Sequence, residues 1–269
     1  MKVQDLYIYP VKSLGGIRLD EALALQKGFE FDRRWMLVDE SGKFISQRTE
    51  HRLSLLQTSI NGDSITIQHK QNPGISISVP FQQSSIGCMV VSVWDDVVEA
   101  NHLSRELDDW FSEFLGKSCR FVYQPETGKR PVSLKYAENQ EQVSFADAFP
   151  YLLISQASLD ELNSRLEVPV PMNRFRPNIV VSGTTPFEED TWAEIQVGEV
   201  RFKVAKPCAR CVLTTVDQET GTTGTEPLAT LARYRSIDNK VMFGQNLIAL
   251  NQGMLRTGGP VKILSFKSQ

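Results

Sequence analysis

Short apolar segments separated by turn signals fill most of the first 123 residues of the chain. Residues 75–79, Ile-Ser-Ile-Ser-Val, alternate with a period of two, which is typical of a strand with one buried face. Trp35–Val38 and Phe44–Gln47 flank the four residues 39–42, and this arrangement predicts a hairpin. The chain shows no regular βαβ alternation. These patterns favour a mainly β protein, built from β-barrels and decorated by a few helices.

Three segments predict short helices. Apolar side chains recur at helical spacing between Leu103 and Phe114, and Gly116 follows as a stop signal. Ser158–Glu161 has the pattern of a capping box, and Glu226–Leu228 places a proline at a helix start. Each helix is too short to form a domain by itself, so the fold class is set by the strands.

Residues 124–144 differ from the rest because they are polar and irregular. A long segment of this kind predicts a linker or a functional loop. We therefore expect two domains, residues 1–123 and residues 124–269, with the boundary in this loop. The chain has neither a G-x-G-x-x-G sequence nor a Walker A sequence, so a nucleotide-binding fold is not expected.

The overall charge and the cysteine content exclude several classes of protein. A formal charge of −3 and a pI near 5.7 argue against non-specific binding of nucleic acid. No secretory signal and no apolar run of membrane-spanning length is visible, so we expect no membrane association. Four cysteines in 269 residues do not suggest a disulfide scaffold, and we expect a cytoplasmic protein.

The segment 206–215, Lys-Pro-Cys-Ala-Arg-Cys-Val-Leu-Thr-Thr, is the first candidate for chemistry. Cys208 and Cys211 are spaced C-x-x-C beside Lys206 and Arg210, and nearby cations favour a reactive thiolate. The residues after Cys211 have high β propensity, so we expect it at the start of a strand. A structural zinc site, a redox dithiol and two unreactive core cysteines remain alternatives, whereas the three histidines are all distant in sequence.

A second candidate feature is a set of basic residues at predicted strand ends. Lys12 and Ser13 follow one strand, Arg33 precedes another, and Arg48 ends a third. Arg174–Asn178 precedes a strand in the second half. Arginine donates paired hydrogen bonds that suit phosphate, and asparagine can both donate to and accept from a heterocycle. Strand ends of a barrel converge, so these residues and the thiolate together predict a phosphate-bearing cofactor with a soft-ligand metal.

Several ordered segments resemble the two-domain MOSC family, which includes the mitochondrial amidoxime-reducing component and bacterial reductases of N-hydroxylated bases. Residues 9–13 and 32–35 are similar to the N-terminal β-barrel domain of that family, and the C-x-x-C segment is similar to its MOSC domain. Further similarity to the MOSC domain lies in residues 175–179, 189–192, 213–217 and 243–245. The resemblance implies an N-terminal β-barrel-like domain followed by a MOSC β-barrel.

The resemblance implies a molybdenum–pyranopterin cofactor, with Cys211 as the metal ligand and the catalytic residue. Cys208 is not a ligand in the family and is expected either to be a bystander or to support the residues that contact the cofactor. The residues that match cofactor-contacting positions are Lys12, Ser13, Arg33, Arg176, Asn178, Ala209, Arg210 and Cys211. Pyridoxal phosphate binding is a further family-level expectation.

The implied activity is the reduction of N-hydroxylated small molecules, such as amidoximes and hydroxylamino bases. No cysteine follows Cys211, so we expect no iron–sulfur domain and a separate electron-donor protein carrying flavin, haem or iron–sulfur. We also expect no membrane anchor. Two other functions stay open: a carrier of cofactor or sulfur through a Cys211 persulfide, and a metal-free binding module.

Overall fold

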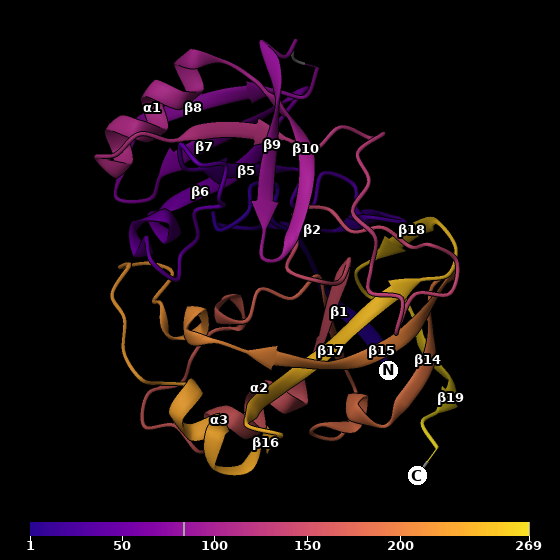
Figure 1. The fold of residues 1–269 in the computed structure, drawn as a ribbon. Coiled ribbons are helices and arrows are strands. Elements are labelled where there is room, and N and C mark those ends of the chain that lie inside the picture. The colour runs from indigo at the N-terminus through magenta and orange to yellow at the C-terminus, as the bar shows by residue number, and fades with distance from the viewer. Residues whose placement is uncertain (83, 269) are drawn as a thin grey trace.

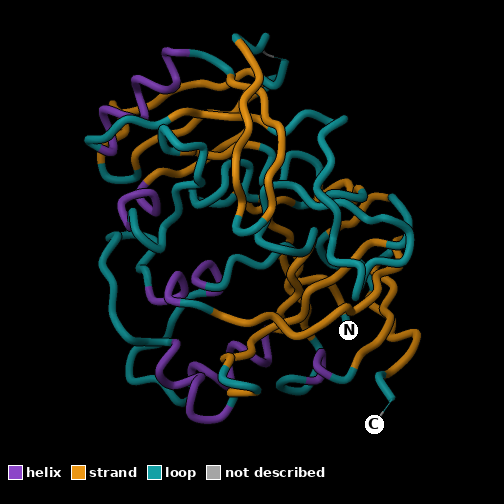
Figure 2. The backbone as a smooth tube through the Cα atoms, in the orientation of Figure 1, coloured by secondary structure: helices purple, strands orange, loops and turns teal. Residues whose placement is uncertain are grey.

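The computed structural model describes residues 1–82 and 84–268 and confirms that the protein is mainly β. Within these residues the strands pair into four sheets, and three α-helices lie around them (Figures 1 and 2). No helix in the same part of the chain has both the length and the apolar character needed to cross a membrane.

The largest sheet joins the two ends of the chain. Strand β1 (Lys2–Ile8) pairs antiparallel with β13 (Ile179–Ser182) and with β2 (Ile17–Leu19), so the indigo start of the chain lies among later strands in Figure 1. The strand order is β19-β14-β15-β17-β12-β13-β1-β2, and β16 pairs with β17. The other members are β12 (Tyr151–Ser155), β14 (Trp192–Val197), β15 (Val200–Arg210), β16 (Ser236–Ile237), β17 (Lys240–Ala249) and β19 (Val261–Phe266).

Three smaller sheets complete the fold. Their orders are β5-β11-β10-β9, β6-β7-β8 and β18-β3-β4. Pairing of β18 with β3 again connects the two chain ends, and residues 124–144 link the halves without a named strand. The boundary at 124–144 stays a prediction. The bounds are β3 (Glu21–Leu25), β4 (Gly28–Phe29), β5 (Trp35–Val38), β6 (Leu56–Asn61), β7 (Ser64–His69), β8 (Asn72–Pro80), β9 (Gly87–Val93), β10 (Asp96–His102), β11 (Arg120–Tyr123) and β18 (Gly253–Arg256).

The helices form where the sequence predicts them, with one correction. Helix α1 (Arg105–Leu115) ends at Gly116 in the left-handed conformation, and α3 (Leu228–Tyr234) begins directly after Pro227. Helix α2 (Gln156–Asn163) is capped by Ser155, so the predicted start at Ser158 is wrong. The Ser155 hydroxyl accepts the Ser158 N–H, while the Ser158 hydroxyl donates to Glu189 at 2.8 Å. Short 3-10 segments are η1 (His51–Leu55), η2 (Met172–Arg174), η3 (Glu188–Asp190) and η4 (Val212–Thr215).

Two predicted strands are also wrong. Of the segment 44–47, only Phe44 forms a bridge, to Val38. Cys211 does not begin a strand but follows the end of β15 and precedes η4. The hydroxyl of Thr214 donates to the Cys211 carbonyl at 3.0 Å, and this local bond competes successfully with the β propensity of the segment.

Candidate functional site

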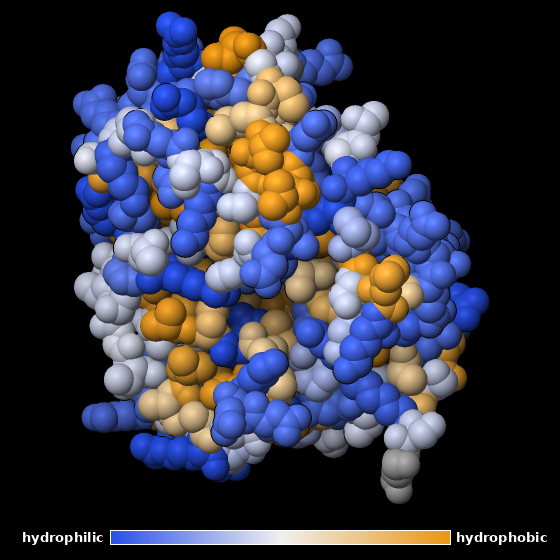
Figure 3. Space-filling model, viewed as in Figure 1, coloured by the Kyte–Doolittle hydropathy of each residue, from blue (hydrophilic) through white to orange (hydrophobic). Residues whose placement is uncertain are grey.

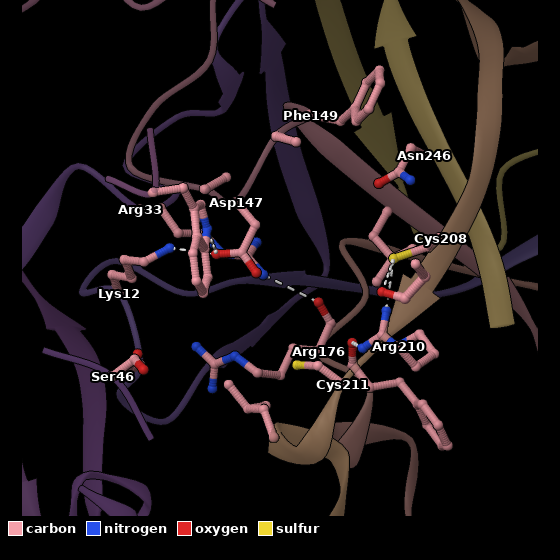
Figure 4. Close-up of a pocket in the computed structure, with 18 of the residues that line it drawn as sticks. Lys12, Arg33, Ser46, Asp147, Phe149, Arg176, Cys208, Arg210, Cys211 and Asn246 are labelled. Atoms are coloured by element: carbon pink, nitrogen blue, oxygen red, sulfur yellow. Dashed lines mark hydrogen bonds and ion pairs between the residues drawn. The ribbon is translucent and has the colours of Figure 1, made fainter. Parts of the chain in front are cut away.

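One pocket collects all eight residues that the sequence suggested as cofactor contacts. Figure 4 shows that they approach from two sides, with Lys12 and Arg33 on one side and Arg210 and Cys211 on the other. The surface is hollowed near the centre of the face in Figure 3, beside the β9–β10 hairpin and the β15–β17 pair. Five cationic side chains and one carboxylate line the pocket: Lys12, Arg33, Arg48, Arg176, Arg210 and Asp147.

The first side, here named the cation wall, consists of Lys12, Arg33, Arg48 and Asp147. Lys12 donates to the carboxylate of Asp147 at 2.6 Å and to the carbonyl of Phe145 at 2.8 Å. Burial lowers the pKa of the Lys12 ammonium, although Asp147 opposes that shift. Burial would raise the pKa of Asp147, but the charge and hydrogen bond of Lys12, supported by Arg48 and Trp94, hold it well below its usual range. Asp147 is therefore a carboxylate at neutral pH.

Arg33 is fixed by four acceptors. Its guanidinium donates to both oxygens of Asp32 at 2.8 and 2.7 Å, to Asn178 Oδ1 at 3.2 Å and to the Arg176 carbonyl at 3.1 Å. Burial raises the pKa of Asp32, and the adjacent Arg33 charge limits that rise. The amide of Asn178 also accepts from Leu152 N and donates to Tyr7 O, so two backbone bonds orient the side chain whose Oδ1 accepts from Arg33.

A single tyrosine ring connects the two sides of the pocket. The guanidinium carbons of Arg33 and Arg176 each lie 4.2 Å from the centroid of the Tyr9 ring. Such contacts orient guanidinium groups as well as attract them. The ring fits there because Gly16 has no side chain, since a Cβ on Gly16 would lie 2.4 Å from Tyr9 Cε1. Gly16, the second of the paired glycines after the first strand, therefore makes room for the ring that orients the two arginines.

The second side, here named the thiol wall, consists of Arg176, Cys208, Arg210 and Cys211. Arg210 donates to the sulfur of Cys208 at 3.0 Å and to the Phe175 carbonyl at 2.7 Å. Both cysteines are free and half-buried, and the Cys211 sulfur points into the pocket in Figure 4. The cation expected to favour a thiolate thus contacts Cys208 directly and not Cys211.

Two donors of the thiol wall have no acceptor within the described residues. They are Nη2 of Arg176 and Nε of Arg210, and both atoms are buried. Burial, followed by the nearby charge of Arg33, lowers the pKa of Arg176 to about 10. A buried donor without an acceptor is costly, and because Arg176 and Arg210 line the pocket, these atoms are available to an anionic or polar ligand there.

Backbone strain is concentrated around the same pocket. Ser13, Arg33, Trp94 and Arg176 all have positive φ, at 71°, 50°, 57° and 55°, and all four line it. Side chains with a Cβ rarely adopt this conformation, and such strain is characteristic of functional sites. The surrounding contacts therefore hold these four residues in positions that the isolated chain would avoid.

Several sequence interpretations change with the structure. Lys206 does not line the pocket, and its ammonium lies 5.0 Å from the centroid of the Tyr136 ring and 5.2 Å from that of the Phe149 ring. Arg174 turns away and pairs with Asp217 at 2.7 Å. Asp147, which sequence reasoning missed, pairs with two of the cations, and its one visible signal is an acidic residue shortly before a predicted strand.

The residues present fit a cofactor that brings its own metal ligands. Among the described residues, no three His, Cys, Asp or Glu side chains gather as a metal site, so the structure offers no support for a zinc site held by the protein alone. A thiolate is a good ligand for a soft metal, and cations suit an anionic phosphate. Two free thiols beside unsatisfied arginine donors therefore fit a metal–pterin phosphate better than a bare ion.

Comparisons with known proteins give the same family for both halves of the chain. Residues 1–118 match the MOSC N-terminal beta barrel domain, and residues 140–262 match the MOSC domain. Mitochondrial amidoxime-reducing component 1 of Mus musculus is 36% identical, over 97% of this chain and 82% of that protein. The Homo sapiens component 1 is 34% identical with the same coverage, and the Rattus norvegicus component 2 is 35% identical over 96% and 82%. The chain belongs to the two-domain MOSC family, together with these amidoxime-reducing components.

Proposed function

We propose that this protein is a molybdenum-dependent reductase of N-hydroxylated small molecules. The observation that carries the proposal is the approach of one free thiol, Cys211, to a pocket lined by five cationic side chains. The names of the similar proteins, which describe reduction of amidoximes, supply the reaction class.

In this proposal the two walls bind different parts of a molybdenum–pyranopterin cofactor. The Cys211 thiolate is the metal ligand, and the unsatisfied donors of Arg176 and Arg210 bind phosphate or pterin oxygens. Ala209 contributes its backbone and Ser13 its hydroxyl. Lys12 and Arg33 add positive charge from the other side, and Asn178 orients Arg33. Cys208 is proposed to orient Arg210 through its sulfur and not to bind metal.

The overall reaction converts an amidoxime, two electrons and two protons into an amidine and water. When bound, the cofactor would supply the two-electron redox chemistry for cleavage of the N–O bond. The protein binds and orients the reactants in the pocket. Asp147 does not suit the role of proton donor, because its pKa lies well below neutrality and Lys12 occupies one of its oxygens. Its proposed role is to hold Lys12 and Arg48 at the pocket.

The proposal includes a separate electron-donor protein carrying flavin, haem or iron–sulfur, and a cytoplasmic location consistent with four free cysteines. Pyridoxal phosphate is not part of it. Within the described residues Lys12 is the one lysine of the pocket, and its ammonium is already engaged by Asp147 and Phe145.

The test is turnover of benzamidoxime by protein purified from a host that makes the cofactor, with an artificial electron donor. We expect benzamidine formation that scales with molybdenum content. Fully loaded protein that forms no benzamidine would contradict the proposal. Intact-mass detection of a persulfide on Cys211, with sulfur transfer to an acceptor protein and no amidine, would instead support the carrier function.

A further inference from the structure

Trp94 combines three unusual properties at the mouth of the pocket. It lies in the turn between β9 and β10, has a φ of 57°, and keeps 42% of its surface exposed while lining the pocket. The two-residue turn between the paired residues Val93 and Asp96 calls for this left-handed backbone, and a bulky side chain is unusual where glycine is the ordinary choice. An exposed indole gains little from burial, so packing alone does not explain this position.

Three contacts fix the indole ring. Its Nε1 donates to Asp147 Oδ1 at 3.2 Å. The Arg48 guanidinium carbon lies 4.0 Å from the ring centroid, and the Phe44 ring meets it edge-on at 4.7 Å and 68°. All three partners also line the pocket, so the ring is held relative to the site and not only relative to its own hairpin.

Phe44 extends the aromatic surface beside this ring. Phe44 and Phe149 line the pocket together with Trp94, and Lys12 and Arg48 of the cation wall are both paired with Asp147. Lys12 lies 5.0 Å from the Phe44 ring, which places the aromatic surface directly beside the cations. A small molecule entering here meets aromatic rings and the basic groups in one space.

We propose that Trp94 is a specificity-determining residue that contacts the substrate and favours flat, conjugated N-hydroxylated amidines over aliphatic ones. This inference rests on the proposed function and names its substrate class. A conjugated ring packs against an indole in an offset or edge-on arrangement that an aliphatic group cannot reproduce. Because the indole is already oriented, little side-chain freedom is lost when the substrate binds.

The experiment compares benzamidoxime with acetamidoxime, which has the same reacting group without the ring, under an artificial electron donor that removes donor docking from the measurement. Trp94→Ala should raise KM for benzamidoxime about tenfold and leave KM for acetamidoxime within about twofold. Trp94→Phe keeps a ring but loses the N–H to Asp147, and it should retain most of the preference. Val97→Ala, at an exposed position of the same hairpin, is the matched control and should behave as the wild type.

A second arm needs no turnover and separates this inference from the proposed function. Benzamidoxime should quench the tryptophan fluorescence of the purified protein, acetamidoxime should not, and Trp94→Phe should lose the quenching. Equal effects of Trp94→Ala on both substrates, or quenching that persists in Trp94→Phe, would overturn the inference. If the wild type reduces neither amidoxime yet shows the selective quenching, the proposed function fails and the binding site stands.

Discussion

The two walls of the pocket differ in how completely their polar groups are satisfied. In the cation wall, Lys12 has two acceptors and Arg33 has four, and Asp147 accepts from three side chains. In the thiol wall, buried donors of Arg176 and Arg210 have no acceptor within the described residues, and the Cys211 thiol is free. The hydrogen-bonding groups of the cation wall find their partners within the protein, whereas those of the thiol wall need a ligand to supply the missing acceptors.

This difference separates two kinds of contribution. Groups whose hydrogen bonds are already made contribute to folding and to the shape of the pocket, and they gain little more from a ligand. Groups left without partners reduce stability and recover that cost when an acceptor binds. Substitutions in the thiol wall should therefore mainly reduce cofactor loading. Substitutions in the cation wall should mainly reduce the free energy of unfolding.

The largest expected effect is that of Cys211→Ser. A serine hydroxyl stays protonated at neutral pH and is a poor ligand for a soft metal, so bound molybdenum should fall to background, more than tenfold below the wild type. The measurement is the metal and pterin content of protein from a cofactor-producing host. The melting temperature without cofactor should change by little, because the thiol is half-buried and exposed to the pocket.

Cys208→Ser is the matched control for that substitution. A serine oxygen can still accept the hydrogen bond that Arg210 donates to the Cys208 sulfur, so most of the cofactor should remain. Equal loss of molybdenum from both variants would show that the assignment of Cys211 as the ligand is wrong. A larger loss of molybdenum from Cys208→Ser than from Cys211→Ser would indicate that Cys208 is the metal ligand.

The second prediction concerns the unsatisfied donor of Arg176. Arg176→Lys keeps the positive charge and places another residue with a Cβ at the same left-handed backbone position. It replaces the guanidinium group, including the buried Nη2 that has no acceptor, with a single ammonium. Losing one charge-assisted hydrogen bond should weaken cofactor retention about tenfold, as measured by pterin release during dialysis. Arg174, two residues away, pairs with Asp217 outside this pocket. Arg174→Lys is therefore the matched control and should retain the cofactor as the wild type does. Similar release from both variants would contradict the distinction between the walls.

The sequence predicted the members of these walls better than it predicted their contacts. Lys12, Arg33 and Arg176 could be grouped because each lies near a strand end, and strand ends converge in a folded β protein. The role of Asp147 could not be predicted, because it depends on the path of residues 124–147. Those residues lack a repeating pattern, and the buried guanidinium of Arg130 holds their end by donating to the carbonyls of residues 144, 146 and 147.

The pairing of strands that are far apart in sequence could not be predicted from local sequence patterns either. Strand β1 pairs with β13, more than 170 residues later, and nothing local in either segment signals that partner. The segment after Cys211 was misread because its threonines have β propensity, while their hydroxyls donate to carbonyls three residues earlier. Local propensity therefore identified most strands, but tertiary contacts and side-chain-to-backbone bonds decided the residues around the thiol.

The smallest expected effect, and a test of the cation wall, is that of Asp147→Asn on acid stability. The pKa of Asp147 is lower in the folded protein than its usual value, so its ionised form stabilises the fold above the unfolded pKa of about 3.9. That contribution is lost as the pH falls through the folded pKa. Because the side chain is 56% exposed, solvent screening limits it to about 1 kcal/mol or less at pH 7.

The melting temperatures of wild type and Asp147→Asn should therefore differ at pH 7, and the difference should shrink only as the pH falls below about 3.9 toward the lower folded pKa. High salt should narrow the difference at pH 7, since part of it is a screened interaction with Lys12 and Arg48. Asp20→Asn, at a side chain that is 90% exposed, is the control and should leave stability unchanged. If the difference in melting temperature widened toward low pH, it would contradict a pKa of Asp147 that is lower in the folded than in the unfolded protein. If Asp147→Asn loses cofactor but keeps the stability of the wild type, Asp147 acts mainly in cofactor binding. That result would contradict the proposed difference between the cation wall and the thiol wall.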